Sequence, residues 1–298
     1  MSAPSGQGGA NNSASPIGMN LETPNAEDVP VRDAATVMLL RNASDARSGF
    51  EVAMLRRNLQ SDFVGGAYVF PGGGVDPGDT SVDYEHICVG RADADASAQV
   101  DVHAGGLAFW VAAVRESFEE SGVLLAVHRE GGMIDLDDPT VAMRFAEHRR
   151  AVDSGERSLG EICQEESLVL TTDRMHYFSR WITPLGAPRR YDTRFFVAHA
   201  PEGQEPVHDD REVISSVWVS PAVALEKHAA GEFDLIFPTV RTLESLVQFD
   251  SADAVIDHAA SMSGIDPILP RVVVHASGLR IVLPDDHEYD AVTSRLLN

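Results

Sequence analysis

Short apolar runs, rather than long helical stripes, follow the polar first segment of the chain. The runs at residues 34–41 and 50–57 are separated by a polar segment that contains glycine, which predicts a β-hairpin. Four further runs have the composition of strands, at residues 168–171, 175–183, 194–199 and 213–219. Because these runs alternate with helical patterns and are joined partly by hairpins, the sequence predicts an α/β protein with a mixed sheet.

The helical patterns between these runs carry recognisable start signals. Asp138 followed by Pro139 predicts the N-cap and the first helical position of a helix over residues 138–153. Ser158, with Glu161 three positions later, predicts a capping box for a second helix. Later in the chain we expect two helices and a short hairpin, at residues 221–231, 239–249, and 272–275 with 279–283.

The most informative stretch combines a glycine-rich turn, Gly72–Gly74, with an acidic helical pattern that ends at a left-handed C-cap, Gly122. Glu116, Glu119 and Glu120 stand three and four positions apart, which places their carboxylates on one helical face. Like charges at this spacing repel one another, and Mg²⁺ and Mn²⁺ prefer oxygen ligands. The trio therefore predicts a site for a divalent cation.

The other positions of this helix predict how it packs. Its apolar residues fall on the face opposite Glu116 and should bury against the sheet: Leu107, Trp110, Val114 and Phe118. Ala112 and Ala113 fall beside Glu116, where small side chains would leave room for a substrate. Arg115 precedes Glu119 by four positions and is expected to pair with it.

These residues resemble the Nudix box, G-x5-E-x7-R-E-U-x-E-E-x-G-U, in which U is an apolar residue. The matching positions are Gly73, Arg115, Glu116, Glu119, Glu120, Gly122 and Val123. The chain departs from the pattern because Asp79 replaces the first glutamate and Ser117 replaces an apolar residue. In addition, the spacer runs from Thr80 to Val114 instead of covering seven residues.

One Nudix subgroup, the peroxisomal-type acyl-CoA diphosphatases, is similar to this chain in carrying an insertion inside the box. Segments 178–184, 189–196 and 218–221 also resemble that subgroup, and the resemblance covers roughly residues 32–290. It implies a Nudix-type α/β/α sandwich with a mixed sheet, a helical insertion and a C-terminal extension. It also implies hydrolysis, dependent on Mg²⁺ or Mn²⁺, of coenzyme A or acyl-CoA to 3′,5′-ADP and (acyl-)phosphopantetheine.

The resemblance further implies roles for particular residues. The metal ligands would be Glu116, Glu119, Glu120 and the backbone carbonyl of Gly72, with Arg115 in the catalytic set. A further acid outside the box is expected as a ligand or general base. Four acids lie between two predicted strands, namely Glu205, Asp209, Asp210 and Glu212. We favour Glu212 or Glu205 for this role.

Two groups of arginines are candidates for binding a substrate. Arg56 and Arg57 end a predicted strand, and they either face the substrate or form an exposed strand end. The 3′-phosphate that the resemblance implies would favour an arginine partner, for which Arg189, Arg190 and Arg194 are candidates. These three arginines could equally pair with surface acids.

The composition divides the chain into segments. Residues 1–29 are rich in Ser, Gly, Asn, Ala and Pro, which predicts a disordered tail. Residues 30–240 form the expected Nudix domain. It carries an insertion at 80–106, expected as a surface excursion either near the active site or irrelevant to it, and a helical segment at 138–166. Residues 241–298 are expected to add a C-terminal helix and hairpin to the same domain.

Charge and cysteine content restrict the partners. The formal net charge of −23 argues against nucleic acid, because phosphate contacts need a basic surface. Two cysteines do not make a disulfide framework and favour a cytoplasmic setting. No apolar window is long enough to predict a membrane span. The expected partner is a small-molecule nucleotide conjugate, and the resemblance adds the expectation of a homodimer.

Other functions remain open at this level. Within the same family, ADP-ribose, NADH or another nucleotide conjugate is an alternative substrate. A non-catalytic binding or regulatory module on the same fold would usually lack one of the three box glutamates, all of which are present. An isomerase on this fold would need a catalytic cysteine, but Cys88 lies in the insertion and Cys163 in a predicted helix.

Overall fold

The computed structural model describes residues 29–43, 49–59, 65–80, 82–208, 212–275 and 278–290. The predicted disorder of residues 1–29 therefore lies almost wholly outside the described residues. So do Asp209 and Asp210.

The main sheet is mixed, as the sequence predicted. Its strands are ordered β10-β7-β8-β1-β2-β3, with β4 added to β1 and β9 added to β2. Their bounds are β1 Val31–Asn42, β2 Phe50–Arg57, β3 Tyr68–Val69, β4 Gly72–Gly74, β7 His176–Ile182, β8 Arg190–His199, β9 Val213–Val219 and β10 Pro267–Ile268. Strand β1 runs parallel to β8 but antiparallel to β2 and β4.

Strand β1 has a different neighbour along each half of one edge. Its first half pairs with the glycine turn, with Ala34 opposite Gly74 and Thr36 opposite Gly72. Its second half pairs with β2, beginning with Leu40 opposite Val52. The glycine turn and β2 therefore share one edge of β1.

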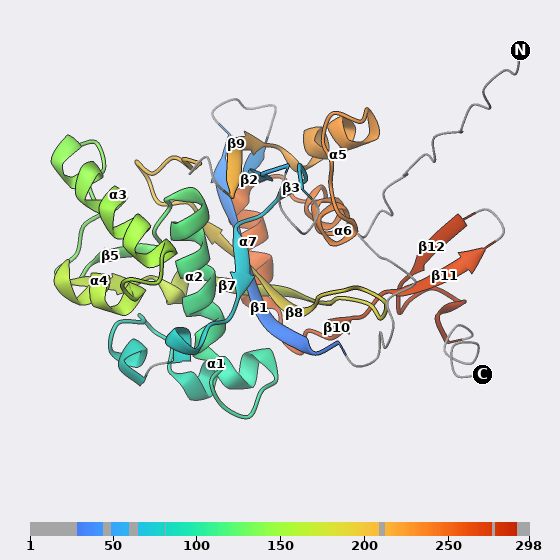
Figure 1. Cartoon of the computed structure of the whole chain (residues 1–298), viewed down its shortest axis with the longest axis horizontal. Coiled ribbons are helices and arrows are strands. Elements are labelled where there is room, and N and C mark those ends of the chain that lie inside the picture. The colour runs from blue at the N-terminus through green and yellow to red at the C-terminus, as the bar shows by residue number, and fades with distance from the viewer. Residues whose placement is uncertain are drawn as a thin grey trace, which may run out of the picture.

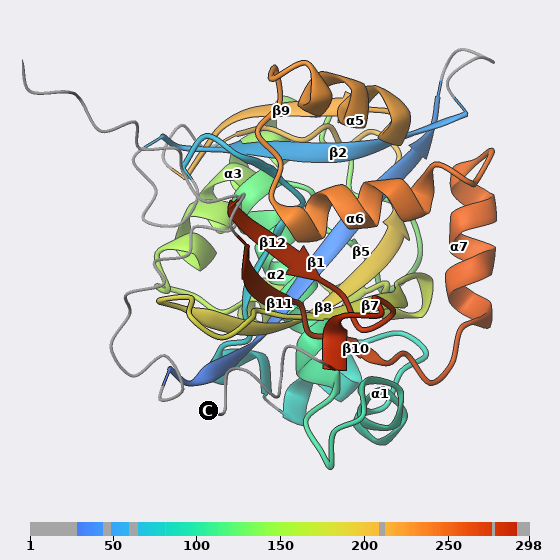
Figure 2. The same ribbon diagram turned by 90° about the vertical axis from the view of Figure 1, so that its right-hand side faces the viewer.

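Helices cover both faces of the sheet, because the side chains of β1 alternate between two cores. Val37 and Leu39 pack toward α2 (Leu107–Ser121), together with residues of α1 (Asp93–Val100), α3 (Pro139–Asp153) and α4 (Leu159–Glu165). Met38 and Leu40 pack on the other side, with residues of α5 (Pro221–Ala229), α6 (Phe237–Leu246) and α7 (Ala252–Ser261). Figures 1 and 2 show these two helical layers, which confirm the α/β/α sandwich.

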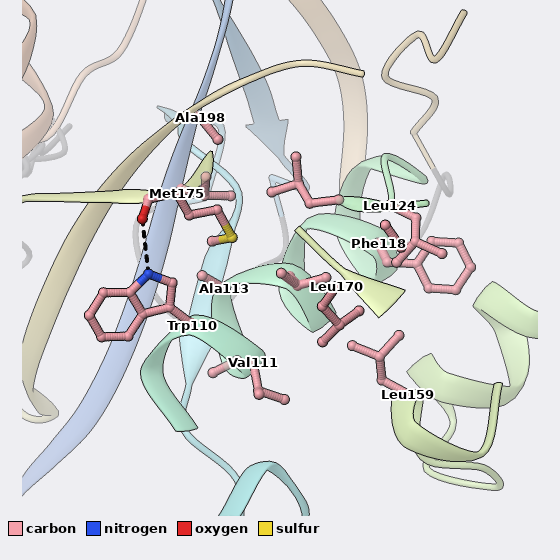
Figure 3. Close-up of a cluster of buried hydrophobic side chains, with 14 of the residues drawn as sticks. Trp110, Val111, Ala113, Phe118, Leu124, Leu159, Leu170, Met175 and Ala198 are labelled. Carbon is pink, nitrogen blue, oxygen red and sulfur yellow. Dashed lines mark hydrogen bonds between the residues drawn. The ribbon is translucent and has the colours of Figure 1, made fainter. Parts of the chain in front are cut away.

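The helix that carries the box glutamates is anchored deeply. The four apolar residues expected on its buried face are each at most 4% exposed: Leu107, Trp110, Val114 and Phe118. The indole N–H of Trp110 donates to the carbonyl of Met175 at 3.0 Å (Figure 3). At the C-terminal end, Gly122 adopts a left-handed conformation with φ of 72°. The orientation of α2 is thus set by the core rather than by its acidic face.

Several local predictions are confirmed. The side chain of Asp138 caps α3, with Pro139 in its first turn. Ser158 and Glu161 form the predicted capping box of α4. The C-terminal hairpin pairs β11 (Arg271–His275) with β12 (Gly278–Val282). Two short strands, β5 (Ala126–His128) and β6 (Leu168–Leu170), form a separate pair.

Helix α7 was missed by the sequence analysis. Ser251 precedes it, and the Ser251 side chain accepts a hydrogen bond from the N–H of Ala254. Val255 and Ala259, four positions apart, are buried against the sheet. The signal was present as a serine cap before a short apolar stripe.

The insertion packs at the start of α2. A 3₁₀ turn, Pro77–Thr80, leads into it, and it contains a second 3₁₀ turn, Val82–His86, followed by α1. The Asp93 carboxylate accepts hydrogen bonds from the backbone N–H groups of Gly105 at 2.9 Å and Leu107 at 3.0 Å. The Arg91 guanidinium lies 4.2 Å from the ring centre of Trp110. The insertion thus holds the N-terminus of the helix that carries the acids.

Within the described ranges, every helix is too short or too polar to traverse a lipid bilayer.

Candidate active site

The acidic helix and the glycine turn meet as the sequence predicted. A Cβ atom added to Gly73 would lie 2.3 Å from Oε1 of Glu116, so a side chain at this position would displace the carboxylate. The backbone N–H of Gly72 donates to Oε2 of Glu120 at 3.0 Å. The turn and two of the three box glutamates therefore form one unit.

The carbonyl of Gly72 faces the same side as its N–H. Thr36 and Gly72 face each other across β1 and β4, and the flanking pair bonds through the N–H of Val37 and the carbonyl of Pro71. In an antiparallel pair, the N–H and C=O of alternate residues point away from the partner strand. The Gly72 N–H meets Glu120, so its carbonyl also points away from β1, toward α2.

Arg115 ties the parts of the box together. Its guanidinium makes a two-pronged contact with Asp79, with Nε to Oδ1 and Nη2 to Oδ2 both at 3.0 Å. Nη1 donates to Glu116 at 2.9 Å and to Glu119 at 3.0 Å. Nη2 also donates to the carbonyl of Gly74 at 2.7 Å. The shorter side chain of Asp79 therefore reaches the arginine across the long insertion.

The three glutamates hold their protons unusually tightly. Burial raises the pKa of Glu116 to about 7 and that of Glu119 to about 7, against the opposing effect of Arg115. Burial, followed by repulsion from Glu116, raises the pKa of Glu120 to about 8. A bound divalent cation would compensate this unfavourable negative charge.

The donor set fits a hard cation. Glu116, Glu120 and the Gly72 carbonyl offer only oxygen atoms, the ligands that Mg²⁺ and Mn²⁺ prefer. Among the described His, Cys, Asp and Glu side chains, three ligand atoms within 4.8 Å of one another occur only in the group His148, Glu165 and Glu166. Of the three glutamates of α2, Glu116 and Glu119 accept from Arg115, whereas Glu120 accepts from the Gly72 N–H.

A cavity of about 390 Å³ opens beside these acids. Glu116, Glu120, Glu212 and the three glycines of the turn line one part of it. The other lining residues come from β1, the end of β2, residues 69–70, the ends of β7 and β8 with the loop between them, the start of α6 and Pro270. No described residue of the insertion at 80–106 is among the lining residues. The surface excursion expected near the active site is therefore found at the start of α2, outside the cavity wall.

Two of the five candidate arginines line the cavity, namely Arg57 and Arg189. Arg56 instead donates to the carbonyl of Gly66 and lies over the ring of Tyr68. Arg190 donates to the carbonyl of Thr183. Neither of these two side chains lines the cavity.

Arg194 is an interior residue, contrary to the expectation that it meets a substrate. It is 1% exposed and pairs with Asp33 at 2.9 Å and with Asp192 at 3.1 Å. Its guanidinium also lies 4.2 Å from the ring centre of Phe109. Position 194 falls on the α2 face of β8, whereas the cavity lies over Thr193 and Phe195 on the other face. Strand alternation thus separates Arg194 from the cavity.

The two acids favoured outside the box, Glu212 and Glu205, lie in different places. Glu212 lines the cavity, and its charge contributes to the raised pKa of Glu120. Glu205 instead binds Arg41 at 2.9 Å and accepts from the indole N–H of Trp218 at 2.7 Å. Only Glu212 is placed to act on a bound ligand.

The small residues beside Glu116 do not make room for a substrate. Ala112 and Ala113 are both fully buried in the core around α2. The aromatic wall of the cavity was also missed, because Trp181, Tyr191, Phe195 and Phe237 come from three separate elements. No local sequence pattern joins them, and only the strand pairing brings them together.

Comparison with known proteins shows the family to which this chain belongs. The family model described as the NUDT19 Nudix domain matches residues 87–246, a little over half of the chain. The acyl-coenzyme A diphosphatase NUDT19 of Gallus gallus is 28% identical, over 87% of this chain and 79% of that protein. The Homo sapiens protein of the same name is 29% identical, over 81% and 72%. A NUDIX hydrolase structure from Alicyclobacillus acidocaldarius has 25% identity and a TM-score of 0.63, covering 80% of this chain and all of that one.

Proposed function

Because the chain belongs to the family of the NUDT19 Nudix domain, we propose that it hydrolyses the diphosphate linkage of coenzyme A or an acyl-CoA. The products would be 3′,5′-ADP and (acyl-)phosphopantetheine. Relatives named acyl-coenzyme A diphosphatase, which align over most of this chain, support the substrate class. The observation that carries the proposal is the meeting of Glu116 and Glu120 with the glycine turn at the wall of one cavity.

The residues of the site divide the work of this reaction. Glu116, Glu119, Glu120 and the Gly72 carbonyl would hold Mg²⁺ or Mn²⁺, which neutralises phosphate oxygens and lowers the pKa of bound water. Arg115 positions Glu116 and Glu119 by donating to both carboxylates. Glu212, which lines the same part of the cavity as Glu116 and Glu120, would accept the proton of the water that attacks phosphorus. Arg57 supplies positive charge near Glu120 for the diphosphate.

Substitution of the box glutamates tests the proposed chemistry. A screen of nucleotide conjugates with Mg²⁺, read by product mass, should show cleavage of CoA by the wild type. Glu119→Gln and Glu120→Gln should each lower kcat by about 10²-fold or more, because the site loses a negative charge that holds the cation. Glu205→Gln is the matched control, since its carboxylate binds Arg41 outside the cavity. Unchanged turnover in both box variants would refute the proposal.

The 3′-phosphate of CoA provides a second test. Arg189 lines the cavity and would pair with this phosphate, so Arg189→Gln should raise the KM for CoA by about tenfold. Its neighbour Arg190 donates to Thr183 and does not line the cavity, which makes Arg190→Gln the control. Dephospho-CoA should be insensitive to both changes. Equal turnover of CoA and dephospho-CoA by the wild type would remove this role of Arg189.

ADP-ribose, NADH and other nucleotide conjugates remain in the same screen as alternative substrates. Cleavage of none of them, with metal bound, would favour a binding module. A cytoplasmic location is proposed on the two buried free thiols, Cys88 and Cys163. The homodimer stays a prediction from the family resemblance.

A further inference from the structure

The cavity has two chemically different ends, and the strand register fixes how far apart they lie. Gly74 pairs with Ala34, Ala34 with Thr193, and Thr193 with Trp181, in a row across four strands. All four residues line the cavity. Neighbouring strands are about 4.8 Å apart, so the row spans about 14 Å from the glycine turn to Trp181. Along this row the cavity floor has small side chains near the acids and an aromatic side chain, Trp181, at the far end.

Aromatic side chains enclose the far end. Trp181 comes from the floor, and Phe237 comes from the first turn of α6. The rings of Trp181 and Phe237 meet edge to face with centroids 6.2 Å apart. Such walls suit a flat ring, which can stack on one aromatic face while another borders its edge.

Trp181 differs from the other two tryptophans of the chain. The indole N–H of Trp110 donates to Met175 and that of Trp218 donates to Glu205. Trp181 is only 6% exposed. Its indole N–H is buried and has no hydrogen-bond acceptor in the described structure. A buried N–H without an acceptor is costly, and such a group calls for an explanation. Its place in the cavity wall makes a bound ligand the natural acceptor.

We propose that the aromatic end of the cavity binds the nucleobase of the substrate and that Trp181 is its main specificity determinant. A purine offers a flat face for stacking and ring nitrogens that accept an N–H in the ring plane. A saturated acyl chain offers no acceptor and would leave the indole N–H unpaired. This inference rests on the proposed function for the position of the diphosphate at the glutamates.

Binding of 3′,5′-ADP, measured by calorimetry with Mg²⁺ present, tests the inference without turnover. Trp181→Phe keeps an aromatic face but removes the N–H, and it should weaken binding about fivefold. Trp181→Leu removes both and should weaken binding by at least about tenfold. Trp218→Phe makes the same chemical change outside the cavity and should leave binding unchanged. Binding of 4′-phosphopantetheine should be the same in all variants.

Tryptophan fluorescence gives an independent measurement. Titration with 3′,5′-ADP should quench the emission of the wild type and of Trp218→Phe, but not that of Trp181→Phe. If Trp181→Leu fails to fold, the Trp181→Phe result decides. Wild-type affinity for 3′,5′-ADP in Trp181→Phe, with quenching retained, would overturn the inference. A loss confined to 4′-phosphopantetheine, with altered preference for acyl length, would also overturn it by assigning this end to the acyl arm.

The same experiments separate this inference from the proposed function. Absence of CoA cleavage, together with Trp181-dependent binding of 3′,5′-ADP, would refute the CoA diphosphatase and retain the nucleobase site. If Trp181→Phe cleaves CoA with an unchanged KM and binds 3′,5′-ADP as tightly as the wild type does, the nucleobase site is refuted and the CoA diphosphatase is retained.

Discussion

Single atoms decide the geometry of the acidic site. Gly73 and Glu116 are so close that a methyl group on the glycine would overlap the carboxylate, whereas a Cβ on Gly74 would meet only the Asp33 carbonyl at 4.0 Å. Neither glycine has a positive φ, so the difference between them is one of space alone. Adjacent residues of one turn therefore have very different tolerance for a side chain.

Gly73→Ala should displace the Glu116 carboxylate and lower kcat on the order of 10²-fold, because a small misplacement of a ligand costs this much. Gly74→Ala should retain nearly wild-type activity. Steady-state kinetics on the substrate found in the screen, beside thermal melting of each variant, checks the pair. Equal activity losses in the two variants would show that the turn, rather than its contact with Glu116, is what matters.

At the scale of elements, the insertion stabilises α2, the helix that carries the three box glutamates, from outside. Helix α2 has no capping side chain at its own N-cap position, Gly106. Asp93 of α1 replaces it by accepting from the N–H groups of Gly105 and Leu107. Burial opposes ionisation of Asp93, but these hydrogen bonds outweigh it and lower the pKa of the carboxyl. An insertion that interrupts the box thus supplies the cap that α2 lacks.

Asp93→Ala should lower the free energy of unfolding by about 1 kcal/mol, the usual effect of removing a helix N-cap. Because the folded pKa of Asp93 is depressed, its contribution is present above the unfolded pKa and is lost as pH falls through the folded pKa. The stability difference between wild type and variant should therefore shrink at low pH. Denaturant unfolding at neutral and acidic pH measures it, with the exposed Asp95→Ala as control. If Asp93→Ala lowers the free energy of unfolding by no more than Asp95→Ala does, the capping role is excluded.

The whole molecule concentrates buried acid at one place while carrying a formal net charge of −23. Glu116, Glu119 and Glu120 have folded pKa values of about 7, 7 and 8, well above the ordinary value of 4.5. Between about pH 4.5 and 8 the folded protein without metal binds more protons at these groups than the unfolded chain does. Their contribution to stability is therefore present at low pH and declines as pH rises through this window.

Metal binding should reverse this decline. Without metal, the melting temperature should fall from pH 5.5 to pH 8.5, and the rise produced by Mg²⁺ should be larger at pH 8.5, because the ligands must be deprotonated. In the variant with all three glutamates replaced by glutamine, the fall in melting temperature with pH and the rise produced by Mg²⁺ should both be smaller. A Mg²⁺ effect independent of pH, or one retained in the triple variant, would place the cation elsewhere.

The sequence by itself determined the parts that depend on local spacing. The i, i+3, i+4 positions of the glutamates, the apolar stripe of Trp110 and Val114, and the caps at Asp138 and Ser158 are properties of short segments. Each was predicted because helical geometry links residues within one or two turns. The resemblance to the Nudix box rests on the same local order, which the insertion interrupts without altering the second half.

Only the tertiary structure decided what meets across the sheet. Residues 193 and 194 are neighbours in sequence, yet Thr193 lines the cavity and Arg194 lies in a buried ion-pair network on the opposite face. Asp93 reaches α2, and Trp181 reaches the same cavity as Glu120, through strand pairing and packing that no local pattern encodes. The reason is physical: side-chain alternation and strand register turn single-residue steps into opposite sides of a layer.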